Sequence, residues 1–289
     1  MDHDLTERLR TLLAPGAGLV IPGAANALAA RIIESAGFEI VYVAGAGIAN
    51  TYLGVPDVGL TTATELVDHV AAIREAVSVP IIVDGDTGFG NAINLRRTVR
   101  MLERAGVSAV QLEDQVFPKR CGHFEGKSVV PKDEMIQKIK AAVDARADNI
   151  LILARTDSRA VEGLSAALDR AAAYVEAGAD LLFVEAPLDR DELAAIPRQV
   201  PGRHVCNMVY GGKTPLLPRE ELAAMGYAGI LYANAGLQAA MRAMRSVMQH
   251  LRTNGSLAGI GEQLVSFDER QMLVDFAKYK ELEKRYTGA

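Results

Sequence analysis

The sequence predicts an α/β protein of the (β/α)8 TIM barrel class, and three observations support this prediction. One unit recurs along the chain: a helical pattern, a small residue, a glycine and then an apolar run. Eight apolar runs alternate with helical patterns within roughly 250 residues, the usual length of such a barrel, whereas an open doubly wound sheet usually has fewer strands. The runs are apolar throughout, as is typical of parallel strands that are buried on both faces.

The predicted strands comprise four that follow a repeated glycine and four that lie between these copies. The repeated glycines are Gly37, Gly106, Gly178 and Gly226, and glycine readily adopts the left-handed conformation that ends a helix. Each copy of the unit is therefore a helix that leads into a parallel strand. In chain order the predicted strands span residues 19–21, 40–43, 81–83, 109–112, 150–154, 181–184, 204–206 and 229–232.

Helices are predicted between these strands from capping signals and helical spacing. Thr62 and Glu65 form a capping box, after which Leu66, Val70 and Ile73 recur on one helix face. This alternation of helix and strand is what a (β/α)8 barrel requires. Similar helical patterns cover residues 95–104, 132–145, 164–177, 191–196 and 219–224.

An apolar seam follows the eighth strand. Leu237, Met241, Met244, Met248 and Leu251 are spaced at alternating four- and three-residue steps, which places them on one helix face. Two interpretations are open at this point. The helix is either the eighth helix of the barrel wall or a contact between subunits.

A second helical segment closes the sequence after a polar stretch over residues 253–261. A helix is predicted over 267–286, where apolar residues mix with many charges. A helical tail outside a barrel more often docks on a neighbour than stands free, so we expect an oligomer. The predicted organisation is one barrel domain over 1–289, with a C-terminal helical extension over about 253–289 that takes part in oligomer packing.

The composition excludes several classes of protein. The 289 residues include 31 lysines and arginines against 36 aspartates and glutamates, a formal net charge of −5, so the chain lacks the basic footprint of a nucleic-acid binder. No apolar run approaches the ~20 residues that span a membrane. With two cysteines, Cys121 and Cys206, and no secretory pattern at its start, we expect a cytoplasmic protein without a disulfide framework.

Polar residues end almost every predicted strand, at the barrel edge where active sites of this fold lie. Burying carboxylates beside apolar strands costs several kcal/mol each unless they are paired or bind a cation, so acids that converge on one mouth indicate a metal. These strand-end residues are Asp84 and Asp86 after the third strand, Glu113 after the fourth, Arg155 after the fifth, Glu185 after the sixth and Asn207 after the seventh.

Asp84 and Asp86 are the best candidate ligands, because residues two apart at a strand end point the same way. Asp57, Glu113 and Glu185 are companion acids. Ligands that are all oxygen favour a hard cation, and room for water and substrate oxygens is typical of Mg²⁺, with Mn²⁺ as an alternative. An ordinary Asp-Gly turn, with Asp86 capping the next helix, is the competing interpretation.

The longest interval between a predicted strand and its helix contains a second candidate group, Lys119-Arg120-Cys121-Gly122-His123. Long loops at barrel mouths often act as lids, and two cations and a histidine beside a thiol create a reactive acid/base group. The alternative is an incidental cysteine in a basic loop. Cys206, inside an apolar strand, is predicted to be a core residue.

Gly45-Ala46-Gly47 follows the second strand, as a dinucleotide-binding fingerprint would. The third glycine of that fingerprint is replaced by Asn50, and no acidic residue ends a strand at the expected distance, so a dehydrogenase is disfavoured. The backbone amides of this segment remain candidates for holding a substrate carboxylate.

Four motifs together carry a family resemblance. Lys119-Arg120-Cys121-Gly122-His123, residues 83–90 (Val-Asp-Gly-Asp-Thr-Gly-Phe-Gly), Glu113-Asp114-Gln115 and Ala154-Arg155-Thr156-Asp157 resemble the isocitrate lyase/phosphoenolpyruvate mutase superfamily over residues 5–286. The chain is most similar to the short carbon–carbon lyases, a branch with methylisocitrate lyase, dimethylmalate lyase, oxaloacetate hydrolase and petal death protein. The Lys-Arg-Cys-Gly-His motif is specific to bond-cleaving members, since mutases and decarboxylases generally lack its cysteine.

The resemblance implies a Mg²⁺-dependent cleavage of a 2-hydroxy dicarboxylate or tricarboxylate to an α-keto acid and a carboxylate. It also implies a lid that closes over the substrate and a homotetramer, built as a dimer of dimers that swap the eighth helix. The implied metal residues are Asp84, Asp86 and Glu113. The implied substrate residues are Tyr42, Gly45, Ala46, Asp57, Arg155, Glu185 and Asn207. Cys121 is the implied proton donor, with Lys119, Arg120 and His123 as further catalytic residues.

Departures from the family pattern bear on the substrate. Phe124 and Glu125 follow His123, where methylisocitrate lyases resemble one another in a basic run, and Ala44 and Ala233 replace a common serine and proline. An apolar and an acidic residue are poor partners for a third carboxylate, which favours a smaller alkylated malate such as 2,3-dimethylmalate. The alternatives are methylisocitrate, oxaloacetate hydrolysis or decarboxylation, phosphomutase chemistry on the same fold, and a barrel without activity that senses a ligand.

Overall fold

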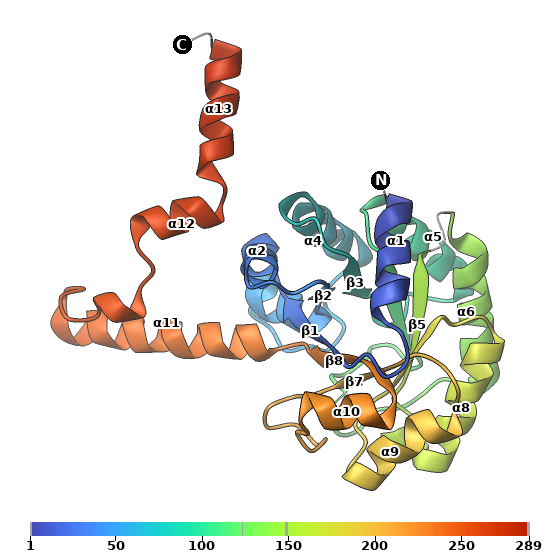
Figure 1. Ribbon diagram of the computed structural model, residues 1–289. Helices are drawn as coiled ribbons and strands as arrows, with labels where there is room; N and C mark the ends of the chain where they lie inside the picture. The colour runs from blue at the N-terminus through green and yellow to red at the C-terminus, as the bar shows by residue number, and fades with distance from the viewer. Residues whose placement is uncertain (1, 123, 148–149, 288–289) are drawn as a thin grey trace.

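The structure, a computed structural model, confirms the closed eight-stranded barrel, and describes residues 2–122, 124–147 and 150–287. All strands are parallel and pair in chain order, with the eighth strand returning to the first (Figure 1). The strands are β1 Leu19–Ala24, β2 Val41–Val43, β3 Ile81–Asp84, β4 Ala109–Glu113, β5 Leu151–Thr156, β6 Leu181–Val184, β7 His204–Asn207 and β8 Tyr227–Tyr232. The four repeated glycines all have positive φ, between 88° and 108°, as the repeat predicts.

The helices surround the barrel, and they include several that the sequence did not predict. The additional elements are α1, which precedes the barrel, the short α3 with the π-helical turn that continues it, and α7. The helices are α1 Asp2–Leu12, α2 Ala27–Ser35, α3 Gly45–Ile48, the π-helix Ala49–Leu53, α4 Ala63–Ala76, α5 Ala92–Arg104, α6 Lys132–Ala145, α7 Arg159–Glu162, α8 Leu164–Glu176, α9 Arg190–Gln199, α10 Arg219–Met225, α11 Ala235–Asn254, the 3₁₀ turn Gly261–Gln263, α12 Phe267–Leu273 and α13 Phe276–Thr287.

Three apolar clusters hold the barrel together, and the two largest lie on its outer and inner faces. Alternate residues of each strand point outward to the helices or inward to the barrel axis, because successive side chains of a strand lie on opposite faces. On β4, Val110 and Leu112 join the outer cluster, whereas Ala109 joins the inner one. Leu9 of α1 packs into that inner cluster, so α1 closes one end of the barrel. The same alternation directs the next inward positions of β4 and β5 into the open mouth.

The predicted capping signal at α4 is confirmed. Thr62 accepts from the Glu65 amide, and the Glu65 carboxylate accepts from the Thr62 amide at 2.8 Å. Leu66, Val70 and Ile73 are all buried on the face that the spacing predicts. At α5 the capping residue is Asn91, which excludes the interpretation of Asp86 as a helix cap.

The C-terminal segment decides against one open interpretation and corrects one expectation. Met241, Met244 and Met248 are 52%, 65% and 53% exposed, so α11 does not complete the wall of its own barrel. Figure 1 shows α11 leaving the barrel as a long arm, with α12 and α13 beyond it. The helix predicted over 267–286 is two helices, because Asp275 takes a left-handed conformation with φ 57° between α12 and α13. The helix swap and the tetramer stay predictions.

None of the helices in the described part of the chain has both the length and the apolar character needed to cross a membrane.

Candidate active site

Arg155 lies at the centre of the barrel mouth and gathers three acids around its guanidinium. Its Nε and Nη2 donate to the two carboxylate oxygens of Asp157 at 2.9 and 3.1 Å. Nη2 lies 3.1 Å from Glu185, and Nε lies 3.4 Å from Glu113. Burial alone would lower the pKa of Arg155, but Asp157, Glu185 and Glu113 raise it above its usual value. The guanidinium is therefore charged and held in one orientation.

Glu113 is buried beside Arg155 yet poorly bonded. Neither of its carboxylate oxygens has a hydrogen-bond partner among the described residues. Burial raises its pKa well above the usual value, although Arg155 and Lys119 oppose the shift. A buried carboxylate without donors is destabilising unless another group binds it.

Asp84 and Asp86 leave the end of β3 as the sequence predicts. Asp84 accepts hydrogen bonds from the Gln111 amide at 3.0 Å and from the Asp86 backbone at 3.2 Å. A Cβ built on Gly45 would lie 3.3 Å from one oxygen of each aspartate, so these oxygens face the backbone that follows β2. Burial raises the pKa of Asp86 to about 7, against the opposing charge of Lys119.

Lys119 joins the loop to these acids. Its ammonium lies 2.5 Å from Asp57 and 2.7 Å from Asp86, and the side chain is 3% exposed. Burial alone would lower the pKa of Lys119, but Asp86, Glu113 and further carboxylates raise it well above its usual value. Lys119 therefore stays charged and offsets part of the negative charge of the mouth.

The chemistry of these acids fits a divalent cation. Glu113 carries two buried oxygens that lack hydrogen-bond partners in the described ranges, Oδ1 of Asp86 pairs with Lys119 at 2.7 Å, and all the candidate ligands are carboxylate oxygens, which Mg²⁺ prefers. No three His, Cys, Asp or Glu side chains within those ranges form a complete metal-binding group. One or two carboxylates, completed by water and substrate oxygens, are the usual protein contribution to a Mg²⁺ site.

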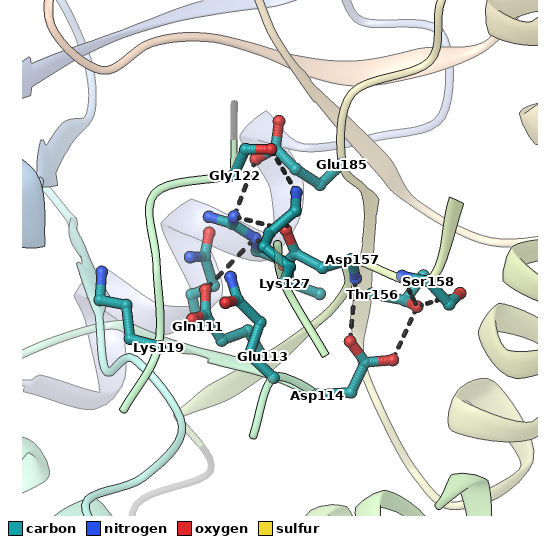
Figure 2. A network of polar contacts seen from close by, with 12 residues as sticks. Gln111, Glu113, Asp114, Lys119, Gly122, Lys127, Thr156, Asp157, Ser158 and Glu185 are labelled. Atoms are coloured by element: carbon teal, nitrogen blue, oxygen red, sulfur yellow. Dashed lines mark hydrogen bonds and ion pairs between the residues drawn. The ribbon is translucent and has the colours of Figure 1, made fainter. Parts of the chain in front are cut away.

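The Cys121 loop lies directly on the mouth. The Cys121 amide donates to the Asp57 carbonyl at 3.2 Å, and the residue is partly exposed. A Cβ on Gly122 would lie 2.4 Å from Nη2 of Arg155 and 2.6 Å from the Glu185 carboxyl carbon, so only glycine fits there. The prediction that this loop covers the strand ends is consistent with these contacts. Figure 2 shows Gly122 beside Glu185.

The remaining predicted site residues differ in whether they reach the acids of the mouth. Arg120 is exposed, and its guanidinium donates to the Glu125 carbonyl at 3.3 Å rather than reaching the acids. Gly45 and Ala46 do not form a loop but begin α3 directly after β2. Asn207 ends β7, and its side-chain oxygen has no partner in the part of the chain that is described. His123 lies outside the described residues. Cys206 is 2% exposed in the core, as predicted.

Tyr42 reaches the acids through another residue. Its hydroxyl donates to Gln111 at 3.0 Å, and the Gln111 amide donates in turn to Asp84 at 3.0 Å. Burial, with the charge of Asp84, raises the pKa of Tyr42 well above its usual value, so the hydroxyl keeps its proton. Tyr42 therefore orients a candidate metal ligand through Gln111.

Comparisons with known proteins identify the family of the chain. Residues 9–252 match the family described as phosphoenolpyruvate phosphomutase. A curated relative, 2,3-dimethylmalate lyase of Eubacterium barkeri, is 46% identical over 97% of each chain. This chain belongs to the phosphoenolpyruvate mutase/isocitrate lyase superfamily. A further relative of this superfamily member is 2-methylisocitrate lyase of Aeropyrum pernix, 42% identical over 96% of this chain and 88% of the relative.

Solved structures of the superfamily agree with the fold over nearly the whole chain. Oxaloacetate acetylhydrolase in complex with the inhibitor 3,3-difluorooxalacetate has a TM-score of 0.92 at 31% identity, covering 99% of this chain and 98% of its own. Phosphonopyruvate hydrolase in complex with oxalate and Mg²⁺ has a TM-score of 0.87 at 32% identity, covering 98% and 99%. The family and the names of its relatives make this chain a superfamily lyase.

Three residues at the site of this superfamily lyase are not among those that the sequence predicts. Gln111 and Asp157 lie two positions before Glu113 and two after Arg155, so strand alternation could have identified both as facing the mouth. Lys127 pairs with Asp157 at 2.9 Å, which no local pattern indicates.

Proposed function

We propose that this lyase cleaves the C2–C3 bond of a 2-hydroxy dicarboxylate of the alkylmalate type in a Mg²⁺-dependent reaction. With 2,3-dimethylmalate the products are pyruvate and propionate. The observation that supports the proposal most directly is the close packing of Gly122, next to Cys121, on Arg155 and Glu185. It brings a thiol-bearing loop, a carboxylate-binding guanidinium and underbonded acids to one mouth.

The metal would be held by Asp84 and Asp86, with Glu113 in support, and the oxygens of these carboxylates fit Mg²⁺ or Mn²⁺. When bound, the cation would polarise the C2 oxygen and stabilise the keto acid that forms. The charge of Lys119 beside Asp57 and Asp86 offsets part of the repulsion among these acids.

The residues of the barrel mouth account for the two ends of a dicarboxylate. Arg155 offers a charged, pre-oriented guanidinium to one carboxylate. The backbone at Gly45 and Ala46 faces the aspartates and is suited to the keto-acid oxygens. At the second carboxylate the Asn207 side-chain amide would donate a hydrogen bond. Glu185 would act there by orienting the Arg155 guanidinium, which it contacts at 3.1 Å.

Bond cleavage requires one proton to leave and another to arrive. The C2 hydroxyl loses its proton to a base of the site, the C2–O bond becomes a carbonyl, and the electron pair of the C2–C3 bond moves onto C3. The C3 carbanion is stabilised by its own carboxylate and is protonated by the Cys121 thiol, which becomes a thiolate. A new C3–H bond completes the monocarboxylate product.

The loop next to Cys121 favours a substrate with two carboxylates. Phe124 is 47% exposed and Glu125 is 93% exposed, so the loop presents an apolar and an acidic side chain. Neither would stabilise a third carboxylate. The similarity to oxaloacetate acetylhydrolase supports a second candidate, the hydrolysis of oxaloacetate to oxalate and acetate on the same site.

The decisive experiment is a substrate panel in the presence of Mg²⁺. Dimethylmalate and methylisocitrate are followed by NADH-coupled detection of pyruvate, and oxaloacetate by chromatography of oxalate. We expect the highest kcat/KM with the substituted malate and no turnover after chelation. Faster turnover of methylisocitrate would contradict the size argument, and faster oxaloacetate hydrolysis would favour the second candidate.

Two cysteine variants test the proton donor. Cys121→Ser should lower kcat with the substituted malate at least about 100-fold, the usual contribution of general acid catalysis, and leave KM within threefold. Cys206→Ser is the matched control, because Cys206 is buried in β7 away from the mouth, and it should retain turnover. A decarboxylase or mutase would tolerate the Cys121 substitution.

A further inference from the structure

Lys127 makes an unusual pair of contacts between the Cys121 loop and the barrel. Its ammonium donates to the Asp157 carboxylate at 2.9 Å and also to the backbone carbonyl of Gly122. The Lys127 and Asp157 side chains are 2% and 0% exposed. One buried ammonium therefore connects the residue after Cys121 to the end of β5, as Figure 2 shows.

Asp157 is a rigid anchor for this contact. The same carboxylate oxygen that accepts from Lys127 also accepts from Nη2 of Arg155, and the other oxygen accepts from Nε. The Asp157 backbone donates to Asp114 at 2.9 Å, and Asp114 also accepts from Tyr174 at 2.8 Å. Asp157 thus stays oriented by the barrel even without Lys127.

The Cys121 loop is held to the barrel on both sides of Gly122. Before it, Lys119 pairs with Asp57 and Asp86 at 2.5 and 2.7 Å, and the Cys121 amide donates to the Asp57 carbonyl at 3.2 Å. At the base of the loop, the Val130 amide donates to the Asp114 carbonyl at 2.8 Å. Between these two anchors Lys127 ties the Gly122 carbonyl to Asp157, and so adds a contact at Gly122 itself.

We propose that Lys127 is a positioning residue, which fastens the Cys121 loop to Asp157 and so holds the proton donor over the substrate-binding Arg155. The proposal rests on the proposed function for the meaning of Cys121 and Arg155. Lys127 and Arg155 both donate to the same oxygen of Asp157. The loop and the guanidinium are therefore positioned relative to one carboxylate. A hydrogen bond between charged, buried groups is among the stronger ones in proteins.

The first test is hydrogen exchange, which needs no turnover. Lys127→Met removes the ammonium and keeps the apolar stem, and it should speed exchange of the Cys121 amide about tenfold or more, as expected for the loss of a charged hydrogen bond. The Val130 amide should stay protected as an internal reference. Lys132→Met is the matched control, since Lys132 pairs with Asp169 at 2.7 Å on the surface of α6.

The second test separates positioning from binding. Lys127→Met should lower kcat about tenfold with KM within threefold, because Arg155 keeps its partners, and Lys127→Arg should restore most of the loss. Unchanged exchange at Cys121 would overturn the proposal, and so would faster exchange with unchanged kcat. If the wild-type protein turns over none of the panel while exchange responds as expected, the fastening stands and the proposed function fails.

Discussion

Asp157 and Glu113 lie on two neighbouring parts of the barrel mouth, and both flank the Arg155 guanidinium. Asp157 receives two aligned hydrogen bonds from Arg155 and a third from Lys127. Glu113 lies 3.4 Å from the same guanidinium, and its oxygens have no hydrogen-bond partner in the described residues. We call Asp157 and Asp114, whose carboxylates accept several hydrogen bonds each, the saturated part of the mouth. Glu113 and the candidate metal ligand Asp84 form the candidate metal part.

The difference appears in the two pKa values. Burial opposes ionisation of both acids, yet Arg155 and Lys127 lower the pKa of Asp157 below its usual value, while the pKa of Glu113 is raised. Two equally buried carboxylates therefore have pKa values shifted in opposite directions, because only Asp157 receives aligned hydrogen bonds. A saturated acid stabilises the fold, and an unsaturated acid is available to a ligand at a cost in stability.

The largest expected effect comes from breaking the saturated part. Asp157→Asn leaves Arg155 and Lys127 without a buried counter-charge and should lower the free energy of unfolding by about 3 kcal/mol or more. Urea unfolding of the metal-free protein measures this. Asp169→Asn, which breaks the surface pair with Lys132, is the control and should leave the midpoint unchanged. Equal midpoints for the two variants would contradict the comparison.

The stability difference between wild type and Asp157→Asn should depend on pH. The pKa of Asp157 is lower in the folded state, so its contribution is fully present above the unfolded value of about 3.9 and is lost as pH falls through the folded pKa. The stability difference between wild type and Asp157→Asn should be constant from pH 7 to 5 and shrink below about pH 4. Urea midpoints across this range measure it. A difference that grows on acidification would reverse the assigned sign.

A smaller effect is expected from one hydroxyl on each part of the mouth. Tyr174→Phe removes a donor to Asp114 and should cost about 1 kcal/mol of stability, with turnover within threefold. Tyr42→Phe, the matched variant, releases Gln111 beside Asp84 and should lower turnover more than tenfold. Thermal unfolding and steady-state kinetics on both variants test this contrast. A large turnover loss from Tyr174→Phe alone would show that the two parts are not separate.

The smallest expected change in stability comes from Glu113→Gln, and it is a gain or no change rather than a loss. Glu113→Gln removes a buried charge that lacks aligned donors, so the metal-free protein should be unchanged or more stable by up to about 1 kcal/mol. Calorimetry of Mg²⁺ binding to the same variant should show weaker binding than wild type. A marked loss of stability without metal would mean that Glu113 belongs to the saturated part.

Much of the site could be predicted from the ends of the strands. Asp86, Glu113, Arg155 and Glu185 each follow a short apolar run, and parallel strands of one barrel bring their carboxyl ends together whatever the details of packing. The core position of Cys206 also followed from its neighbours, and its burial confirms that prediction. The neighbours of Cys121 left its role open, and the family resemblance supplied it.

Two features of the C-terminal segment could not be predicted from the spacing of its apolar residues. The arm formed by α11 has the seam of a helix that packs, but only the tertiary structure shows that it leaves its own barrel. Likewise the break at Asp275 within an apparently continuous helical pattern is a backbone event that the spacing of apolar residues does not reveal.

The sequence by itself determined the barrel, the order of its elements and the acids at its mouth, because strand alternation and glycine helix ends are local properties. Only the tertiary structure decided which acids are saturated. Lys127 and Asp157 are 30 residues apart, and their contact exists because the loop after β4 folds back over β5. Hydrogen bonds require alignment within tenths of an ångström, and that alignment is set by the packing of the whole barrel.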